Sequence, residues 1–242
     1  MQITFLSHSG FFIELPALCL LFDWWKGQLP PLPAGKPLLV FASHSHEDHF
    51  SPAIFALDDG SRDVRFLLGK DIKLSPSRRE RWGLHETTAA NCLRLGGLEQ
   101  AQPFHGVVVE TLPSTDAGVA FLVTACGQTI FHAGDLNWWH WSGEPDPWNP
   151  NMERDFKQFI EPLRGRHIDL AMFPLDPRLE RAEGWGLAYY LELTDTTRIL
   201  PMHQWGDYTG TDRFLGAHPQ WADRILPITA EGQHITVEEV EV

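Results

Sequence analysis

Residues 41–50 read FASHSHEDHF, so three histidines and two carboxylates come directly after the apolar residues LLV. His44 and His46 are two positions apart, and in an extended chain their side chains project to the same side. Asp48 and His49 follow on the turn beyond this strand. Imidazoles and carboxylates in this pattern predict a metal site, to which other parts of the chain must also contribute ligands.

Three other apolar segments end in the same kinds of residue. Asp23 follows CLLF, Asp135 follows TIFHAG, and His203 follows RILPM. Because ligand sites of α/β folds commonly lie at the ends of strands, we expect these four strand ends to meet at one edge of a sheet. Histidines and carboxylates gathered there favour metal-dependent hydrolysis.

The elements that carry these residues are short apolar runs, rich in β-branched and aromatic residues, that alternate with polar segments compatible with helices. No repeat or polar linker divides the chain, which predicts one domain over residues 1–242 with strands layered between helices. We expect strands at 3–7, 11–15, 19–22, 38–43, 64–69, 107–112, 119–125, 129–132, 168–175 and 198–202. We expect helices at 51–58, 75–82, 152–164, 180–194 and 217–224.

The charge of the chain limits its partners. Its formal net charge of −13 repels polyanions, so we expect a small-molecule substrate and no nucleic-acid partner. No apolar segment reaches the length of a membrane span, and the first residues do not resemble a signal peptide. We therefore expect a cytoplasmic protein with no membrane partner, and the sequence leaves open whether it forms a homo-oligomer.

The three cysteines, Cys19, Cys92 and Cys126, are far apart and form no CxxC pair. Their odd number predicts a reducing compartment and no disulfide framework. We expect Cys92 and Cys126 to be buried as small apolar residues.

Taken in order, these motifs resemble the metallo-β-lactamase fold hydrolases and, within them, the branch similar to the ascorbate-6-phosphate lactonase-like proteins. The resemblance covers nearly the whole chain and implies an α/β protein with a four-layer αββα sandwich that binds one or two divalent metal ions, zinc or manganese. It rests on FLSHSGFFIE at the start, the acid at Asp23, HxHxDH at 44–49, FHAGD at 131–135 and PMH at 201–203.

The resemblance also implies a ligand set. It assigns the first metal to His44 and His46, the second metal to Asp48, His49 and His203, and the bridging position to Asp135. A hydroxide held between the metals would attack the substrate, and Asp48 would be the catalytic residue that orients it.

One family ligand is missing from this sequence. The third histidine of the family should stand shortly before the strand that precedes FHAGD, where the chain reads LPSTDAG, residues 112–118. In a two-metal enzyme, the position of this third ligand is taken by Asp116, by a water or by the neighbouring His105. His140 is a further candidate, ranked below Asp116. If none of them does, the protein is a one-metal enzyme.

Several residues are candidates for supporting roles, each with an ordinary structural alternative. Asp23 either orients the metal ligands without binding the metal itself or is an ordinary loop acid. His8 either lies near the metal site or is a core histidine. Trp139 and its neighbours form an aromatic wall over the substrate or pack in the core.

Asp176 and Arg178 follow the strand expected at 168–175. Arg178 binds an anionic group of the substrate with two hydrogen bonds or forms a surface ion pair, and the sequence does not choose between these.

The bond that the enzyme cleaves is not decided by the ligands, because this fold accepts several substrates. We expect a metal-dependent hydrolase of a small ester, lactone or phosphoester. The alternatives are a mononuclear non-haem iron oxidoreductase that uses His44, His46 and Asp135, and a non-catalytic binding protein with a partly degenerate metal site. A nuclease is disfavoured by the net charge of −13.

Overall fold

The computed structural model describes residues 1–238, and the chain divides into two compact units. The first unit comprises Met1–Gly96 with the described part of Glu231–Val242, and the second comprises Gly97–Ala230. No helix among the described residues combines the length and apolar character needed to cross a membrane. The assignment of residues 1–242 to one domain stays a prediction.

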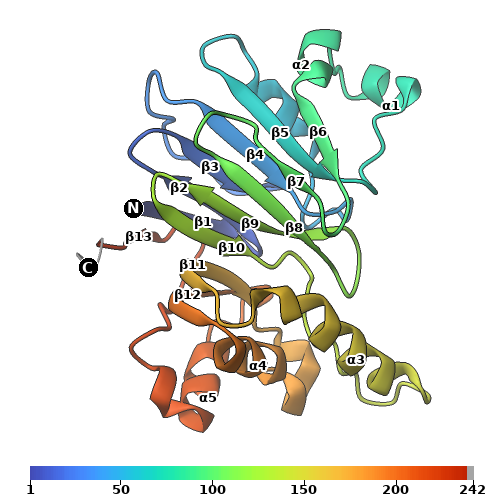
Figure 1. Ribbon diagram of the computed structural model, residues 1–242, viewed down its shortest axis with the longest axis vertical. Helices are drawn as coiled ribbons and strands as arrows, with labels where there is room; N and C mark the ends of the chain where they lie inside the picture. Colours follow the sequence, from blue (N-terminus) through green and yellow to red (C-terminus); the bar gives the residue numbers. More distant parts are fainter. Residues whose placement is uncertain (239–242) are drawn as a thin grey trace. The chain divides into compact units, whose positions relative to one another are not determined.

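The first unit contains a seven-stranded mixed sheet with the order β13-β1-β2-β3-β4-β5-β6 (Figure 1). Strands β1 to β3 are antiparallel neighbours, whereas β3 to β6 run parallel. Strands β3 and β4 are buried along their whole length, as expected for central parallel strands. The strands are β1 Gln2–Ser7, β2 Gly10–Glu14, β3 Cys19–Phe22, β4 Leu38–Ala42, β5 Val64–Gly69, β6 Cys92–Leu95 and β13 His234–Thr236.

The pairing of β3 with β4 determines which side chains meet at their carboxyl ends. Phe22 is in register with Phe41, and their rings stack with centroids 4.4 Å apart. The amide of Asp23 then donates a hydrogen bond to the carbonyl of Phe41 at 2.9 Å. The two strands therefore end side by side, with Asp23 next to the start of the histidine motif.

Short helices cover one face of this sheet. Phe50, Ile54, Phe55 and Leu84 pack with alternate residues of β3, β4 and β5 in one buried apolar cluster. Burial of each large apolar side chain stabilises the unit by roughly 1.5–3 kcal/mol. Ser51 caps the first helix and Pro52 begins it, as the Ser-Pro pair predicts. These helices are η1 Pro52–Leu57, α1 Pro76–Arg81 and α2 Glu86–Ala90.

The second unit contains a six-stranded mixed sheet with the order β12-β11-β10-β9-β8-β7. Strands β10, β11 and β12 are parallel, so Asp135 and His203 follow strands that end at the same edge. The antiparallel strands β7 to β10 complete the sheet. The strands are β7 Gln100–Ala101, β8 Val108–Pro113, β9 Val119–Ala125, β10 Gln128–His132, β11 His167–Pro174 and β12 Asp195–Met202.

Helices of the second unit gather beside β11 and β12 (Figure 1). Phe156 of α3 and Tyr190 of α4 both pack against Phe173 of β11, with ring centroids 6.5 and 4.8 Å away. The helices are α3 Trp148–Ile160, η2 Glu161–Leu163, η3 Pro177–Ala182, α4 Trp185–Leu193, α5 Gly210–Ala217 and η4 Pro219–Trp221.

All ten strands expected from the sequence are present, but the four strand ends do not share one sheet. Strands β3 and β4 belong to the seven-stranded sheet, whereas β10 and β12 belong to the six-stranded one. The prediction of a single sheet edge is therefore wrong. Hydrophobic patterning identifies a strand without specifying its partners, because strands pair with neighbours far along the chain.

The helix expected at 217–224 is also wrong, since α5 ends at Ala217 and only η4 lies within that range. Pro219 explains the break, because proline disfavours helical backbone in the residue before it. His218 accordingly has φ −134° and ψ 61°. The expected helix at 180–194 begins later, at Trp185, because Glu180 has a positive φ of 52°.

Cys126 is exposed and Cys92 only partly buried, so the expectation that both are buried is wrong. Cys126 and Gly127 form the two-residue loop of the β9–β10 hairpin, in which Ala125 pairs with Gln128. Both loop residues have positive φ, 52° and 76°, as in a type I′ turn. The thiol therefore projects from a tight turn, away from the core.

This turn yields a stability prediction. Positive φ costs an ordinary L-residue about 1–2 kcal/mol, and asparagine tolerates it better. We expect Cys126→Asn to raise the free energy of unfolding by about 0.5–1 kcal/mol in urea denaturation. Cys126→Ala is the matched control, because it removes the thiol without relieving the backbone, and an equal gain in both variants would contradict the explanation.

Candidate functional site

The histidine motif begins where β4 ends and forms a compact group of possible metal ligands. His44, His46 and Asp48 each offer one ligand atom, and these atoms lie within 4.8 Å of one another. Nε2 of His44 and Nδ1 of His46 are 3.0 Å apart. Two nitrogens on one tetrahedral zinc ion are separated by roughly 3.3 Å, so this spacing suits a shared ion.

The carboxylate of Asp23 fixes the position of the histidine motif by accepting hydrogen bonds from it. It is fully buried, and its Oδ1 accepts a hydrogen bond from the backbone amide of Ser43 at 2.7 Å. Its Oδ2 accepts from the Ser43 hydroxyl at 2.6 Å and from Nδ1 of His49 at 2.7 Å. Three donors thus compensate one buried negative charge.

These bonds also determine the tautomer of two histidines. The Ser43 hydroxyl gives its single proton to Asp23, so it accepts from Nδ1 of His44, 2.9 Å away. His44 and His49 therefore both carry a proton on Nδ1, and in the neutral rings Nε2 has the lone pair. Metal-binding histidines are typically oriented by this kind of partner.

A second group in the same unit contains His8, Asp48 and His49, whose ligand atoms also lie within 4.8 Å of one another. Nε2 of His8 is 3.4 Å from Oδ2 of Asp48. Burial opposes ionisation of Asp48, but the hydrogen bond from His8 and the charges of His49 and His8 outweigh it. The pKa of Asp48 is consequently held well below its usual range, and the carboxylate is ionised at neutral pH.

In the second unit, Asp135 and His203 lie together, with Nε2 of His203 3.4 Å from Oδ1 of Asp135. Nδ1 of His203 donates to the buried Oδ2 of Asp176 at 2.8 Å. Asp176 thus orients His203 as Asp23 orients His49. Although burial opposes ionisation, the hydrogen bonds from His203 and Arg178 hold the pKa of Asp176 below its usual range.

Arg178 is paired with the buried Asp176, while its own side chain is 46% exposed. Its Nε lies 3.0 Å from each carboxylate oxygen, and its Nη2 donates to Oδ2 at 2.6 Å. Its guanidinium also lies over the rings of Trp205 and Trp141, 4.4 and 5.5 Å from their centroids. Of the two sequence interpretations, the ion pair describes its contacts in the structure.

The segment that lacks the family histidine positions the loop that carries Asp135. The hydroxyl of Thr115 accepts from the amide of Asn137 at 3.1 Å and lies 2.7 and 3.3 Å from the carbonyls of Asn137 and Asp135. The exposed Asp116 comes next, and a ligand oxygen of its carboxylate lies within 4.8 Å of one of Asp135.

The other candidates for the missing ligand lie elsewhere. His105 is exposed in the turn between β7 and β8, and His140 packs against Trp185 with ring centroids 4.8 Å apart. Among the residues that the structure describes, neither belongs to a group of possible metal ligands.

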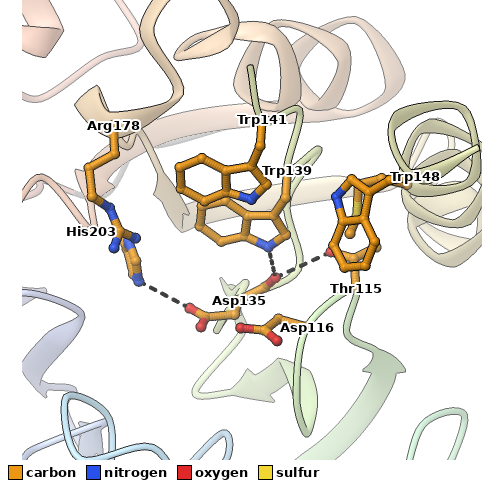
Figure 2. A pocket seen from close by; sticks show the side chains of 9 residues that line it. Thr115, Asp116, Asp135, Trp139, Trp141, Trp148, Arg178 and His203 are labelled. Atoms are coloured by element: carbon orange, nitrogen blue, oxygen red, sulfur yellow. Dashed lines mark hydrogen bonds and ion pairs between the residues drawn. The ribbon is translucent and has the colours of Figure 1, made fainter. Parts of the chain in front are cut away.

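A pocket of about 150 Å³ lies in the second unit (Figure 2). Trp139 donates from Nε1 to the carbonyl of Asp135 at 2.8 Å, and its ring stacks on Trp141 with an interplanar angle of 4°. Trp148 from the start of α3 joins them (Figure 2). The lining residues are Thr115, Asp116, Asp135, Trp139, Trp141, Trp148, Met152, Arg178 and His203.

Sequence reasoning missed the roles of Ser43, Thr115, Trp148, Met152 and Trp205. Ser43 is inside the quoted motif stretch, and its place between the strand and His44 was a usable signal. The others lie on segments that only the folded structure brings to the site, since Trp148 and Met152 belong to α3 and Trp205 follows β12.

A search of known families shows that residues 2–140 match the model described as the β-lactamase superfamily domain. A UPF0173 metal-dependent hydrolase from Opitutus terrae is 28% identical over 151 residues, 56% of this chain and 63% of that relative. The match thus spans less than two thirds of that relative. Another protein of that name, from Desulforamulus reducens, is 25% identical over 84% of both chains.

Solved structures with the same fold include Igni18, a metallo hydrolase from Ignicoccus hospitalis. It covers 99% of both chains with a TM-score of 0.63 and 16% identity. CmlA, a diiron β-hydroxylase from Streptomyces venezuelae, has a TM-score of 0.63 and 12% identity over 98% of this chain and 54% of its own. These likenesses and the family match confirm the predicted α/β fold class.

The buried position of Asp23 yields a stability prediction. Asparagine has one carbonyl oxygen, so Asp23→Asn leaves at least one of its three donors without an acceptor. We expect the free energy of unfolding to fall by about 2–3 kcal/mol, measured in urea with chelator present so that bound metal does not contribute. Glu47→Gln makes the same change at an exposed position of the motif, and a similar loss there would contradict this role for Asp23.

Proposed function

Because this chain belongs to the β-lactamase superfamily, we propose that it is a metal-dependent hydrolase that cleaves a small ester, lactone or phosphoester. The names of the two relatives support the activity. For the finer assignment, we propose the lactonase-like branch and a cytoplasmic, small-molecule-metabolising enzyme. The net charge of −13 supports a substrate other than nucleic acid.

The observation that carries this proposal is the shared orientation of three histidines. Nδ1 of His44, His49 and His203 donates to Ser43, Asp23 and Asp176, respectively. In the neutral rings, each Nε2 then has the lone pair that a metal requires, and polar partners hold the ring in place. Core histidines that only satisfy local hydrogen bonds need no such common pattern.

The donors fit a divalent ion of borderline or hard character. Imidazoles of the motif suit zinc, and the carboxylates of Asp48, Asp116 and Asp135 extend the choice to manganese. A bound ion of this kind supplies Lewis acidity and lowers the pKa of water towards neutrality. We propose one or two such ions, with Asp116 as the carboxylate that takes over from the missing histidine.

Asp48 is the proposed catalytic residue. We assign it to accepting a hydrogen bond from the attacking water and aligning that water with the substrate. His8, 3.4 Å from Oδ2 of Asp48, restricts the orientation of the carboxylate.

Metal content tests the ligand assignment. We expect His49→Ala to weaken metal binding at least ~10-fold, since the loss of even a ligand's supporting partner has that effect. Elemental analysis and competition with a chromophoric chelator measure this change. His105→Ala is the control, and an equal loss of metal in both variants would argue against the site. Bound iron with oxygen consumption and no hydrolysis would replace the hydrolase by an oxidoreductase.

Asp48→Asn tests the role in catalysis. The amide keeps the shape and one oxygen ligand but loses the charge that aligns the water. On a panel of chromogenic esters, lactones and phosphodiesters, we expect kcat to fall about 100-fold or more while metal content stays near the wild-type level. Full rate at full metal occupancy would show that Asp48 has no part in catalysis.

A further inference from the structure

The pocket of the second unit has walls of stacked tryptophan. Trp139 and Trp141 are nearly parallel, and their ring centroids are 6.1 Å apart. In Figure 2 their rings overlap, Trp148 stands beside them, and the carboxylates of Asp135 and Asp116 lie below. Trp148 is 46% exposed, so its indole remains accessible to a molecule that enters from solvent. Such a wall favours a flat partner, because aromatic rings gain from stacking beyond the area that they bury.

The pocket has room for about one ring. Its volume of about 150 Å³ is comparable to that of an enclosed cavity that binds benzene. Met152 completes the apolar side, where its flexible thioether adapts to the edge of a ring. At the other end, Asp135 and His203 are proposed metal ligands, so a group seated on the tryptophans would have its reacting bond directed towards them.

We propose that this pocket binds a single-ring aromatic group of the substrate. The inference rests on the proposed hydrolase function and narrows its substrates to those that carry such a group, such as aryl or benzyl esters and aromatic lactones. Trp141 and Trp148 supply the stacking surface. These residues determine specificity, whereas the metal ligands perform the reaction.

Binding of phenol, which contains no bond to hydrolyse, tests the pocket independently of catalysis. In ligand-observed NMR titrations of the protein as purified, we expect phenol to bind and Trp148→Ala to weaken it about three- to tenfold. Trp185→Ala is the matched control, because Trp185 is 36% exposed in the same unit and does not line the pocket. We expect that variant to bind phenol like the wild type.

Absence of phenol binding, or a phenol affinity that is unchanged in Trp148→Ala, would each overturn the proposal.

The same measurements separate this inference from the hydrolase proposal. Phenol binding that depends on Trp148 in a protein that cleaves none of the ester, lactone and phosphodiester panel would support the aromatic pocket and refute the hydrolase. Hydrolysis by a protein whose phenol binding ignores Trp148 would retain the hydrolase and overturn the pocket.

Discussion

The buried carboxylate of Asp23 is the interaction on which the histidine motif depends. A charge without solvent is tolerated only when donors surround it, and here the donors are the amide and hydroxyl of Ser43 and the ring of His49. Because Ser43 in turn accepts from His44, one carboxylate determines the tautomer of two rings at once. The parallel pairing of β3 with β4 makes this possible, since it ends both strands at the same level.

In the second unit, the buried negative charge of Asp176 is also compensated by hydrogen-bond donors, but these come from different residues. It binds His203, Arg178 and the indole Nε1 of Trp205, so its negative charge is shared between an imidazole and a guanidinium. His203 thereby acquires the orientation of a metal ligand, and Arg178 is held at the wall of the pocket. A single acid therefore positions both a candidate metal ligand and a residue that lines the pocket.

Much of this organisation could be predicted from the sequence. The strands were recognisable because each is a short apolar run with its own turn signals, and Asp23 and Asp176 were suspected because each follows such a run. The partition of the strands between two sheets was not predictable in the same way. Strand pairing is decided by contacts between segments that are distant in the sequence. The residues at the four strand ends are of the same types in both sheets, so they do not indicate which sheet a strand joins. Exposure of Cys126 follows from the tight hairpin turn, which the composition of the loop only partly signals.

The sequence by itself determined the chemical character of the site, because the HxHxDH spacing and the acids after strands are local properties of the chain. Only the tertiary structure decided how the supporting side chains are used. Arg178 pairs with the buried carboxylate of Asp176, a contact that the residue types along the chain do not specify. Likewise, Trp148 joins Trp139 and Trp141 in one pocket because α3 brings it there, and Thr115 holds the Asp135 loop where a metal ligand was expected. Such roles depend on distances through space between separate segments, and residue types and spacing along one segment do not contain them.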